Sequence, residues 1–166
     1  MKYLYLLLFL LISFRSGYSA SRPDIDTVSV MGLTTGLDGK LVRAHVQSKL
    51  DTLLWDDNSG IGIVKFSGDY LNLKGEFRIA YSQGLVSQVS FVAPTKSLED
   101  SKTKFESLSQ QLISMYGPAD VASSGNGQSS DAAVMETRWE GMKQSISVKA
   151  VVGANYVTVA LSKFGM

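Results

Sequence analysis

Alternating apolar and polar residues predict several short β-strands. Residues 75–82 place Phe77, Ile79 and Tyr81 on one side and polar or small side chains on the other, which is the period of two of a half-buried strand. The same alternation recurs in 27–31 and 85–93 and more weakly in 61–67, and three further strands are expected at 133–140, 143–152 and 156–163. Glycine-containing turns separate several of these runs. We therefore expect about six or seven strands in a mainly antiparallel sheet.

Two segments have the period of an amphipathic helix. The first is 37–50, preceded by Thr34-Thr35, which offers an N-cap. Its expected apolar side is Leu37, Leu41, Val42, Val46 and Leu50. The second follows Pro94, can be capped by Thr95 or Ser97, and ends at 116–118, where Gly and Pro stop a helix. Its expected buried stripe is Phe105, Leu108, Leu112 and Met115.

These elements predict an α+β domain with two layers. Each helix has one apolar side, so both should pack on one face of the sheet. The strand side chains expected to face the helices are Phe66, Phe77, Ile79, Val89, Phe91, Trp139, Ile146, Val148, Val157 and Val159. By alternation, the opposite face should hold Arg78, Gln88, Ser90, Ser145, Ser147, Lys149, Tyr156 and Thr158.

The two halves of the chain repeat the same order of elements. Residues 28–35 resemble 89–96, residues 64–68 resemble 137–141, and 77–79 resemble 146–148. This predicts a βαββ duplication with half-repeats 27–83 and 85–165. The order of elements resembles small exported bacterial proteins with repeated helix-plus-antiparallel-sheet units, the group of the β-lactamase inhibitor protein, although the cysteines of that inhibitor are missing. The resemblance implies that a partner contacts the uncovered sheet face or its loops.

The N-terminus has the pattern of a cleavable export signal. Lys2 precedes the apolar run 4–12, and small residues follow at Gly17 and Ser19. The run is shorter than the roughly 20 apolar residues of a membrane-spanning helix, and Arg15 interrupts its end. We expect a signal peptide at 1–19, a flexible leader at 20–26 and one domain at 27–165. The mature protein would then be periplasmic or extracellular, with no transmembrane helix after cleavage.

Composition narrows the chemistry that the domain can perform. The chain has no cysteine, which excludes thiolate chemistry and disulfides. Its net charge of +1 is close to neutral. It carries no clustered basic residues of the kind that bind nucleic acid. The single histidine, His45, falls in the apolar arc of the first helix, which indicates a half-buried structural residue. Residues 56–60 are rich in oxygen ligands but lack EF-hand spacing, so they read as a turn.

No catalytic motif is present, and the Gly/Ser-rich segment 122–131 reads as a flexible connector. We therefore predict a non-enzymatic protein without cofactor or metal. The leading hypothesis is a protein-binding envelope component, either an inhibitor or immunity protein or an assembly accessory, that uses the open sheet face. The alternative is a small-ligand or glycan binder in which Trp55 and Tyr70, expected in loops, supply aromatic contacts. The oligomeric state stays open.

Overall fold

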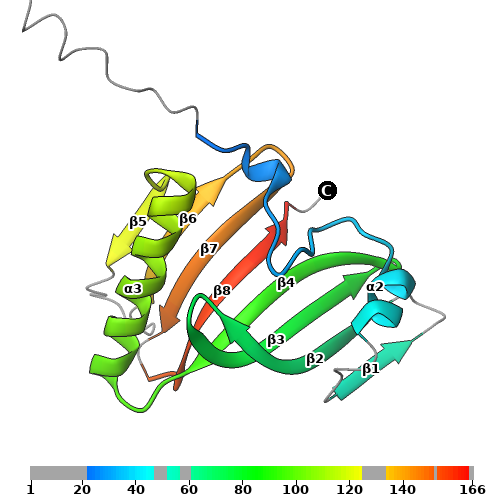
Figure 1. Cartoon of the computed structure of the whole chain (residues 1–166), viewed down its shortest axis with the longest axis horizontal. Helices are drawn as coiled ribbons and strands as arrows, with labels where there is room; N and C mark the ends of the chain where they lie inside the picture. The colour runs from blue at the N-terminus through cyan, green and yellow to red at the C-terminus, as the bar shows by residue number, and fades with distance from the viewer. Residues whose placement is uncertain (1–21, 47–51, 57–60, 125–133, 152, 165–166) are drawn as a thin grey trace, which may run out of the picture.

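The computed structural model describes residues 22–46, 52–56, 61–124, 134–151 and 153–164, so the predicted signal peptide lies outside the described residues. The protein is α+β, with an eight-stranded antiparallel sheet in the order β1-β2-β3-β4-β8-β7-β6-β5 (Figure 1). The strands are β1 Thr52–Asp56, β2 Ile61–Tyr70, β3 Leu73–Ser82, β4 Leu85–Pro94, β5 Val121–Ser124, β6 Val134–Glu140, β7 Gln144–Val151 and β8 Tyr156–Lys163. The helices are η1 Ile25–Thr27 (a 3-10 turn), α2 Gly39–Val46 and α3 Leu98–Tyr116.

In the part of the chain that the structure describes, each half contains an α-helix followed by four strands. Helix α2 leads into β1 to β4 and α3 leads into β5 to β8, and the last strand of each set pairs with the other at the centre of the sheet. The repeating order is therefore αββββ and not the predicted βαββ. Common descent of the two halves stays a prediction.

One predicted strand is wrong, and two strands were not predicted. Residues 27–31 do not form a strand. Thr27 ends η1, and in the segment that follows Val30 forms an isolated bridge with Leu33. The sequence analysis missed β1 and β5, because each has only four or five residues and no clear alternation. Both are edge strands, held by backbone pairing to β2 and β6, which a short sequence window does not reveal.

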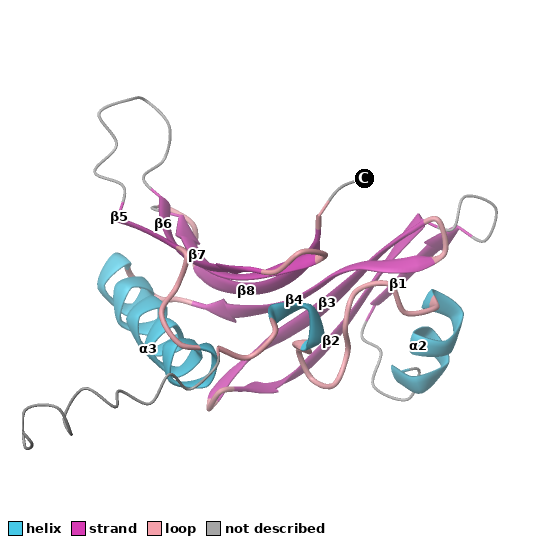
Figure 2. Ribbon diagram, turned by 90° about the horizontal axis from the view of Figure 1, so that it is seen from above, coloured by secondary structure: helices cyan, strands magenta, loops and turns pink. Residues whose placement is uncertain are grey.

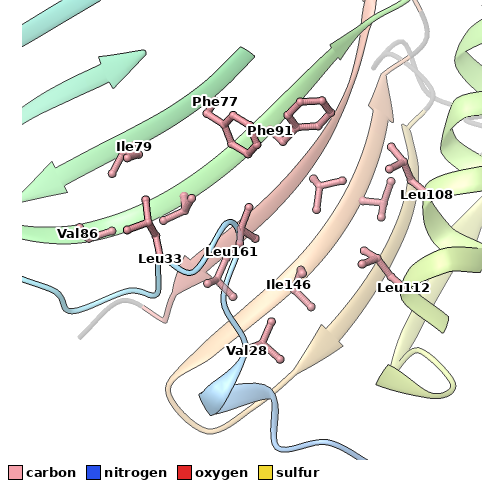
Figure 3. Close-up of a cluster of buried hydrophobic side chains, with 14 of the residues drawn as sticks. Val28, Leu33, Phe77, Ile79, Val86, Phe91, Leu108, Leu112, Ile146 and Leu161 are labelled. Carbon is pink, nitrogen blue, oxygen red and sulfur yellow. The ribbon is translucent and has the colours of Figure 1, made fainter. Parts of the chain in front are cut away.

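The face of the sheet that packs on the core is continuous and apolar (Figure 3). All ten strand residues predicted to face the helices are buried. The register places them in rows across the strands, for example Phe66 beside Phe77, Phe77 beside Phe91, and Phe91 beside Val159. The sequence pattern therefore identified the core side of each long strand.

In both helices, some side chains that were predicted to be buried are exposed. In α2, Val42 and Val46 are buried, whereas Leu41 is 72% exposed. Asp38, not Thr34 or Thr35, caps this helix, because its Oδ1 accepts from the backbone N–H groups of residues 40 and 41 at 2.8 and 3.2 Å. The helix begins two residues later than predicted. Its predicted last residues, 47–50, lie outside the described residues.

Helix α3 follows the prediction more closely. Ser97 caps it by accepting from the Asp100 N–H at 3.1 Å. Leu108 and Leu112 are fully buried, but Tyr116 and not Met115 completes the stripe, and Met115 is 47% exposed. In Figure 2 both helices lie on the same side of the sheet, and the buried side chains of both join one core cluster.

The segment before α2 is attached to the sheet through buried Gln144. Its side-chain N–H groups donate to the carbonyls of Ile25 (2.8 Å) and Val28 (3.0 Å). Its Oε1 accepts from the hydroxyls of Thr34 (3.1 Å) and Thr35 (2.7 Å). Gln144 is 1% exposed, so its whole hydrogen-bonding capacity serves this segment.

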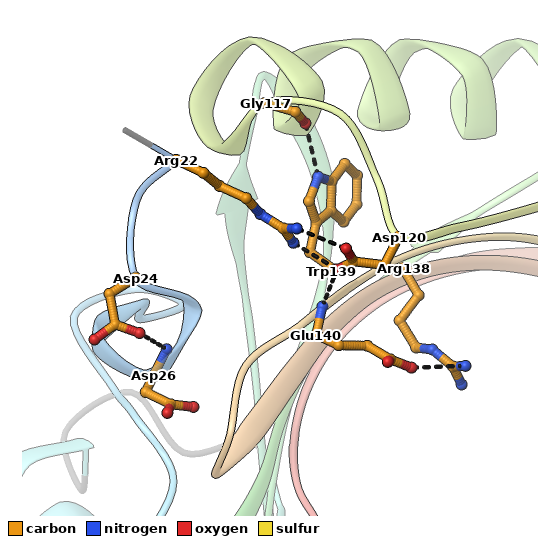
Figure 4. A network of polar contacts seen from close by, with 8 residues as sticks. All are labelled: Arg22, Asp24, Asp26, Gly117, Asp120, Arg138, Trp139 and Glu140. Atoms are coloured by element: carbon orange, nitrogen blue, oxygen red, sulfur yellow. Dashed lines mark hydrogen bonds and ion pairs between the residues drawn. The ribbon is translucent and has the colours of Figure 1, made fainter. Parts of the chain in front are cut away.

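Two carboxylates fasten the same segment from outside. Asp26 accepts three backbone hydrogen bonds from residues 142–144 at 3.0, 2.7 and 3.2 Å. Asp120 receives both Arg22 Nη groups at 2.7 and 2.6 Å and the Glu140 N–H at 2.6 Å (Figure 4). Residues 22–26 of the predicted flexible leader are thus held against the domain.

Candidate binding face

The strand register brings seven of the nine predicted site residues to one face of the sheet. We call the side opposite the core the open face, because neither α2 nor α3 lies on it (Figure 2). One row across the strands runs Arg78, Ser90, Ala160, Ser147 and Arg138. The adjacent rows carry Gln88 on one side and Thr158 with Lys149 on the other, and Tyr156 lies one row further along β8. Ser145, also predicted here, pairs with Ser162 in the row of Gln88.

The middle of the open face has small side chains. Ser90 and Ser147 are each 7% exposed and Ala160 is 8% exposed, although neither helix covers them. Short side chains there lie below the longer side chains around them. The Ser90 hydroxyl also donates to the Arg78 carbonyl at 3.3 Å, so it is part of the sheet's internal bonding. The result is a low floor across β4, β8 and β7.

Two shallow hollows occupy this face. One of about 440 Å³ lies over β3, β4 and the start of β8, and Lys74, Glu76, Arg78, Val92 and Tyr156 are among its lining residues. A second of about 250 Å³ lies over β4, β8 and β7, and Gln88, Ser147, Lys149, Tyr156 and Thr158 are among those that line it. Tyr156, 42% exposed, borders both. Together the two hollows contain six of the seven predicted residues of this face.

Charged side chains on the open face form two groups. On β6 and β7, Glu136 lies 3.3 Å from Lys149 and 3.7 Å from Arg138, and Arg138 lies 2.9 Å from Glu140. On β3, Arg78 Nε donates to Glu76 Oε1 at 2.5 Å. The Arg78–Glu76 pair is partly exposed, and exposed ion pairs contribute little to stability, so it can exchange partners with a bound molecule. The Glu136 side chain is only 17% exposed, so its group is held more firmly in the sheet.

Trp55 and Tyr70 do not form one site. Both lie in strands, not in the predicted loops. Trp55 pairs with Gly62 near the start of β2, whereas Tyr70 ends that strand. Eight residues of strand separate these points, about 26 Å at roughly 3.3 Å per residue.

Tyr70 belongs to the core side of the sheet. Its ring centroid lies 6.1 Å from that of Phe77 and 5.5 Å from that of Phe91. Burial, with a smaller contribution from Tyr116, raises the pKa of its hydroxyl to about 12. Gly75 makes this packing close, because a Cβ there would overlap the Val92 carbonyl oxygen and the Phe91 ring. Tyr70 is therefore a packing residue.

The remaining candidate chemistry gains no support from the geometry. His45 is exposed, and the prediction of a half-buried histidine was wrong because Val42 and Val46 form the buried side of α2 and His45 lies outside it. Asp56 is the last residue of β1, and residues 57–60 lie outside the described residues. Among described residues, no group of three or more metal-ligating side chains is close enough to hold a metal ion. No described helix is long and apolar enough to cross a membrane.

Sequence reasoning missed several residues of the open face. Lys74, Glu76, Val92 and Asn155 line the larger hollow, and Lys65 lies beside Arg78 across β2 and β3. The alternation that placed Arg78 also assigns Glu76 and Val92 to this side. Lys74 lies outside the predicted strand, which began one residue later, and β2 alternates too weakly to place Lys65.

Comparison of the chain with models of protein families, with curated proteins and with solved structures gave no match. The function is therefore inferred from the geometry of the open face.

Proposed function

We propose that this chain is a non-catalytic, exported protein that binds another protein on the open face of its sheet. The observation that carries the proposal is the low floor at Ser90, Ala160 and Ser147 between longer side chains. An antiparallel sheet can leave one face in water, but such a face does not need a central row of small residues. Short side chains there leave room for atoms of a partner.

The rim of this floor suits protein recognition. Tyr156 is 42% exposed and borders both hollows, and tyrosine gives a large contact area for few rotatable bonds. Arg78 and Lys149 flank it, with side chains 39% and 48% exposed. Tyrosine and arginine are among the residues that dominate binding energies at interfaces.

A pull-down from envelope extract tests the proposal. The tagged protein, expressed as the full chain, would be compared with a triple variant, Arg78→Ala, Lys149→Ala and Tyr156→Ala. A matched control carries Lys102→Ala, Glu106→Ala and Gln110→Ala, three exposed positions of α3. We expect a protein that the native form and the α3 control retain and the open-face variant loses. Equal retention by all three forms would overturn the open face as the site.

The identity of the retained protein separates two versions of the function. A tight complex with a secreted toxin or hydrolase would indicate an inhibitor or immunity protein. Co-purification with membrane machinery would indicate an accessory of envelope assembly. The small-ligand alternative predicts instead that a soluble ligand changes the tryptophan fluorescence while no protein is retained.

A further inference from the structure

The half of the open face formed by β2 and β3 carries an excess of positive charge. Its cations are Lys65, Lys74 and Arg78, and its anions are Asp69 and Glu76. Of these, only Arg78 and Glu76 form an ion pair between described residues. Lys65 lies directly opposite Arg78 in the register, and like charges in that position destabilise a sheet.

Arg78 has donor groups left for a partner. Its Nε is bound to Glu76, whereas its two Nη groups have no hydrogen bond to a described residue. Guanidinium groups bind carboxylates with two parallel hydrogen bonds. Lys74 and Arg78 line the same hollow, so a carboxylate that enters it meets two cations.

Apolar side chains lie next to this charge on the same face. Ile63 is two residues before Lys65 on β2 and pairs with Ala80, and Leu85 pairs with Ser82 at the end of β3. Ile61 and Leu85 are 59% and 41% exposed. An apolar strip beside an excess of cations suits a protein segment that carries both acidic and apolar side chains.

We propose that the partner presents an acidic segment, with at least one carboxylate held by Arg78, Lys65 and Lys74 and an aliphatic or aromatic side chain on the strip of Ile61, Ile63 and Leu85. This inference rests on the proposed function and specifies the chemistry of the partner. Glu76 competes with the incoming carboxylate for Arg78, so its removal should strengthen binding. If Arg78 had only a structural role, replacing Glu76 would not strengthen binding, so a Glu76 variant distinguishes the two roles.

The probe is a library of disulfide-closed peptides with seven random positions displayed on phage, selected on the whole protein. We expect the bound peptides to be enriched in Asp and Glu over the starting library. Affinity for the best synthetic peptide should fall about fivefold for Arg78→Gln and for Lys65→Gln, as expected for partly exposed charge pairs. It should rise about twofold to threefold for Glu76→Gln, and Lys102→Gln on α3 should leave it unchanged.

The outcomes separate this inference from the proposed function. Peptides that lose binding to the Arg78, Lys149 and Tyr156 triple variant but are not acidic would overturn the inference and keep the open face as the site. Weaker binding by Glu76→Gln would also overturn it. A selection that yields only peptides retained by the triple variant would count against the open face itself. Lys65→Gln should also raise the melting temperature by about 1 to 3 °C, because it removes the like-charge pair.

Discussion

Replacing Gln144 with methionine removes four hydrogen bonds while nearly preserving the length and volume of the side chain. The Val28 carbonyl loses the one hydrogen bond that it makes to the described residues, whereas the Ile25 carbonyl keeps the Val28 N–H at 3.2 Å. The hydroxyls of Thr34 and Thr35 are half-buried and can rotate toward water. A buried group without a partner costs about 1 to 3 kcal/mol, so we expect Gln144→Met to lower the free energy of unfolding by about 2 to 4 kcal/mol.

Urea unfolding followed by tryptophan fluorescence measures this loss. Trp139 is fully buried, and its Nε1 donates to the Gly117 carbonyl at 2.8 Å, so unfolding changes its surroundings. Gln88→Met is the matched control, because Gln88 is half-buried on the open face and forms no side-chain hydrogen bond to a described residue. We expect the control to change stability by less than about 0.5 kcal/mol. A loss for Gln144→Met no larger than that of the control would refute the role assigned to Gln144.

Three further predictions concern local geometry and pH. Gly75→Ala should lower the free energy of unfolding by about 2 to 3 kcal/mol in the same urea assay, because its Cβ would overlap backbone of β4. Asn72, exposed at φ 63° in the β2–β3 turn, should tolerate glycine, whereas Asn72→Ala should lose about 1 kcal/mol; equal stability of the two variants would contradict this. The hydrogen bond from Arg22 lowers the pKa of Asp120 to about 2, and backbone hydrogen bonds, above all from Lys143, lower that of Asp26. Both folded-state pKa values lie below the unfolded value of about 3.9, so the stabilisation is lost as the pH falls. The melting temperature should therefore stay constant from pH 7 to about pH 5 and decrease toward pH 2. The decrease should be less steep in Asp120→Asn.

The long strands could be predicted because each carries its own evidence. In β3 the burial pattern follows the alternation of apolar with polar or small residues. In β4, β7 and β8 the apolar residues of the core side are buried as predicted, but small or apolar residues of the open face are buried as well. An error of one residue in the alternation would have moved every side chain to the other face, so correct alternation was enough to assign Arg78, Lys149 and Tyr156 to the same face. Their role in binding stays a prediction.

The missed features share a physical cause, which is dependence on distant partners. Strand β5 is four residues long and exists because β6 pairs with it. In the sequence, nothing distinguishes Asp26 from the polar residues around it. Its role depends on the turn at 142–144, which donates three backbone N–H groups to its carboxylate. A Cβ on Gly141 would overlap the carboxylate of Asp26 and displace it from its backbone hydrogen bonds, although the two residues are far apart in the sequence.

By itself, the sequence determined the α+β class, the composition of the core and the side of the sheet on which polar residues gather, because period and hydrophobicity act within a few residues of one another. The tertiary structure decided the order of the eight strands, the αββββ repeat and the attachment of residues 22–35 to the sheet. Only the tertiary structure places Tyr70 in the core and Lys65 next to Arg78. These features depend on which strands become neighbours, and that choice is made by packing across the whole domain.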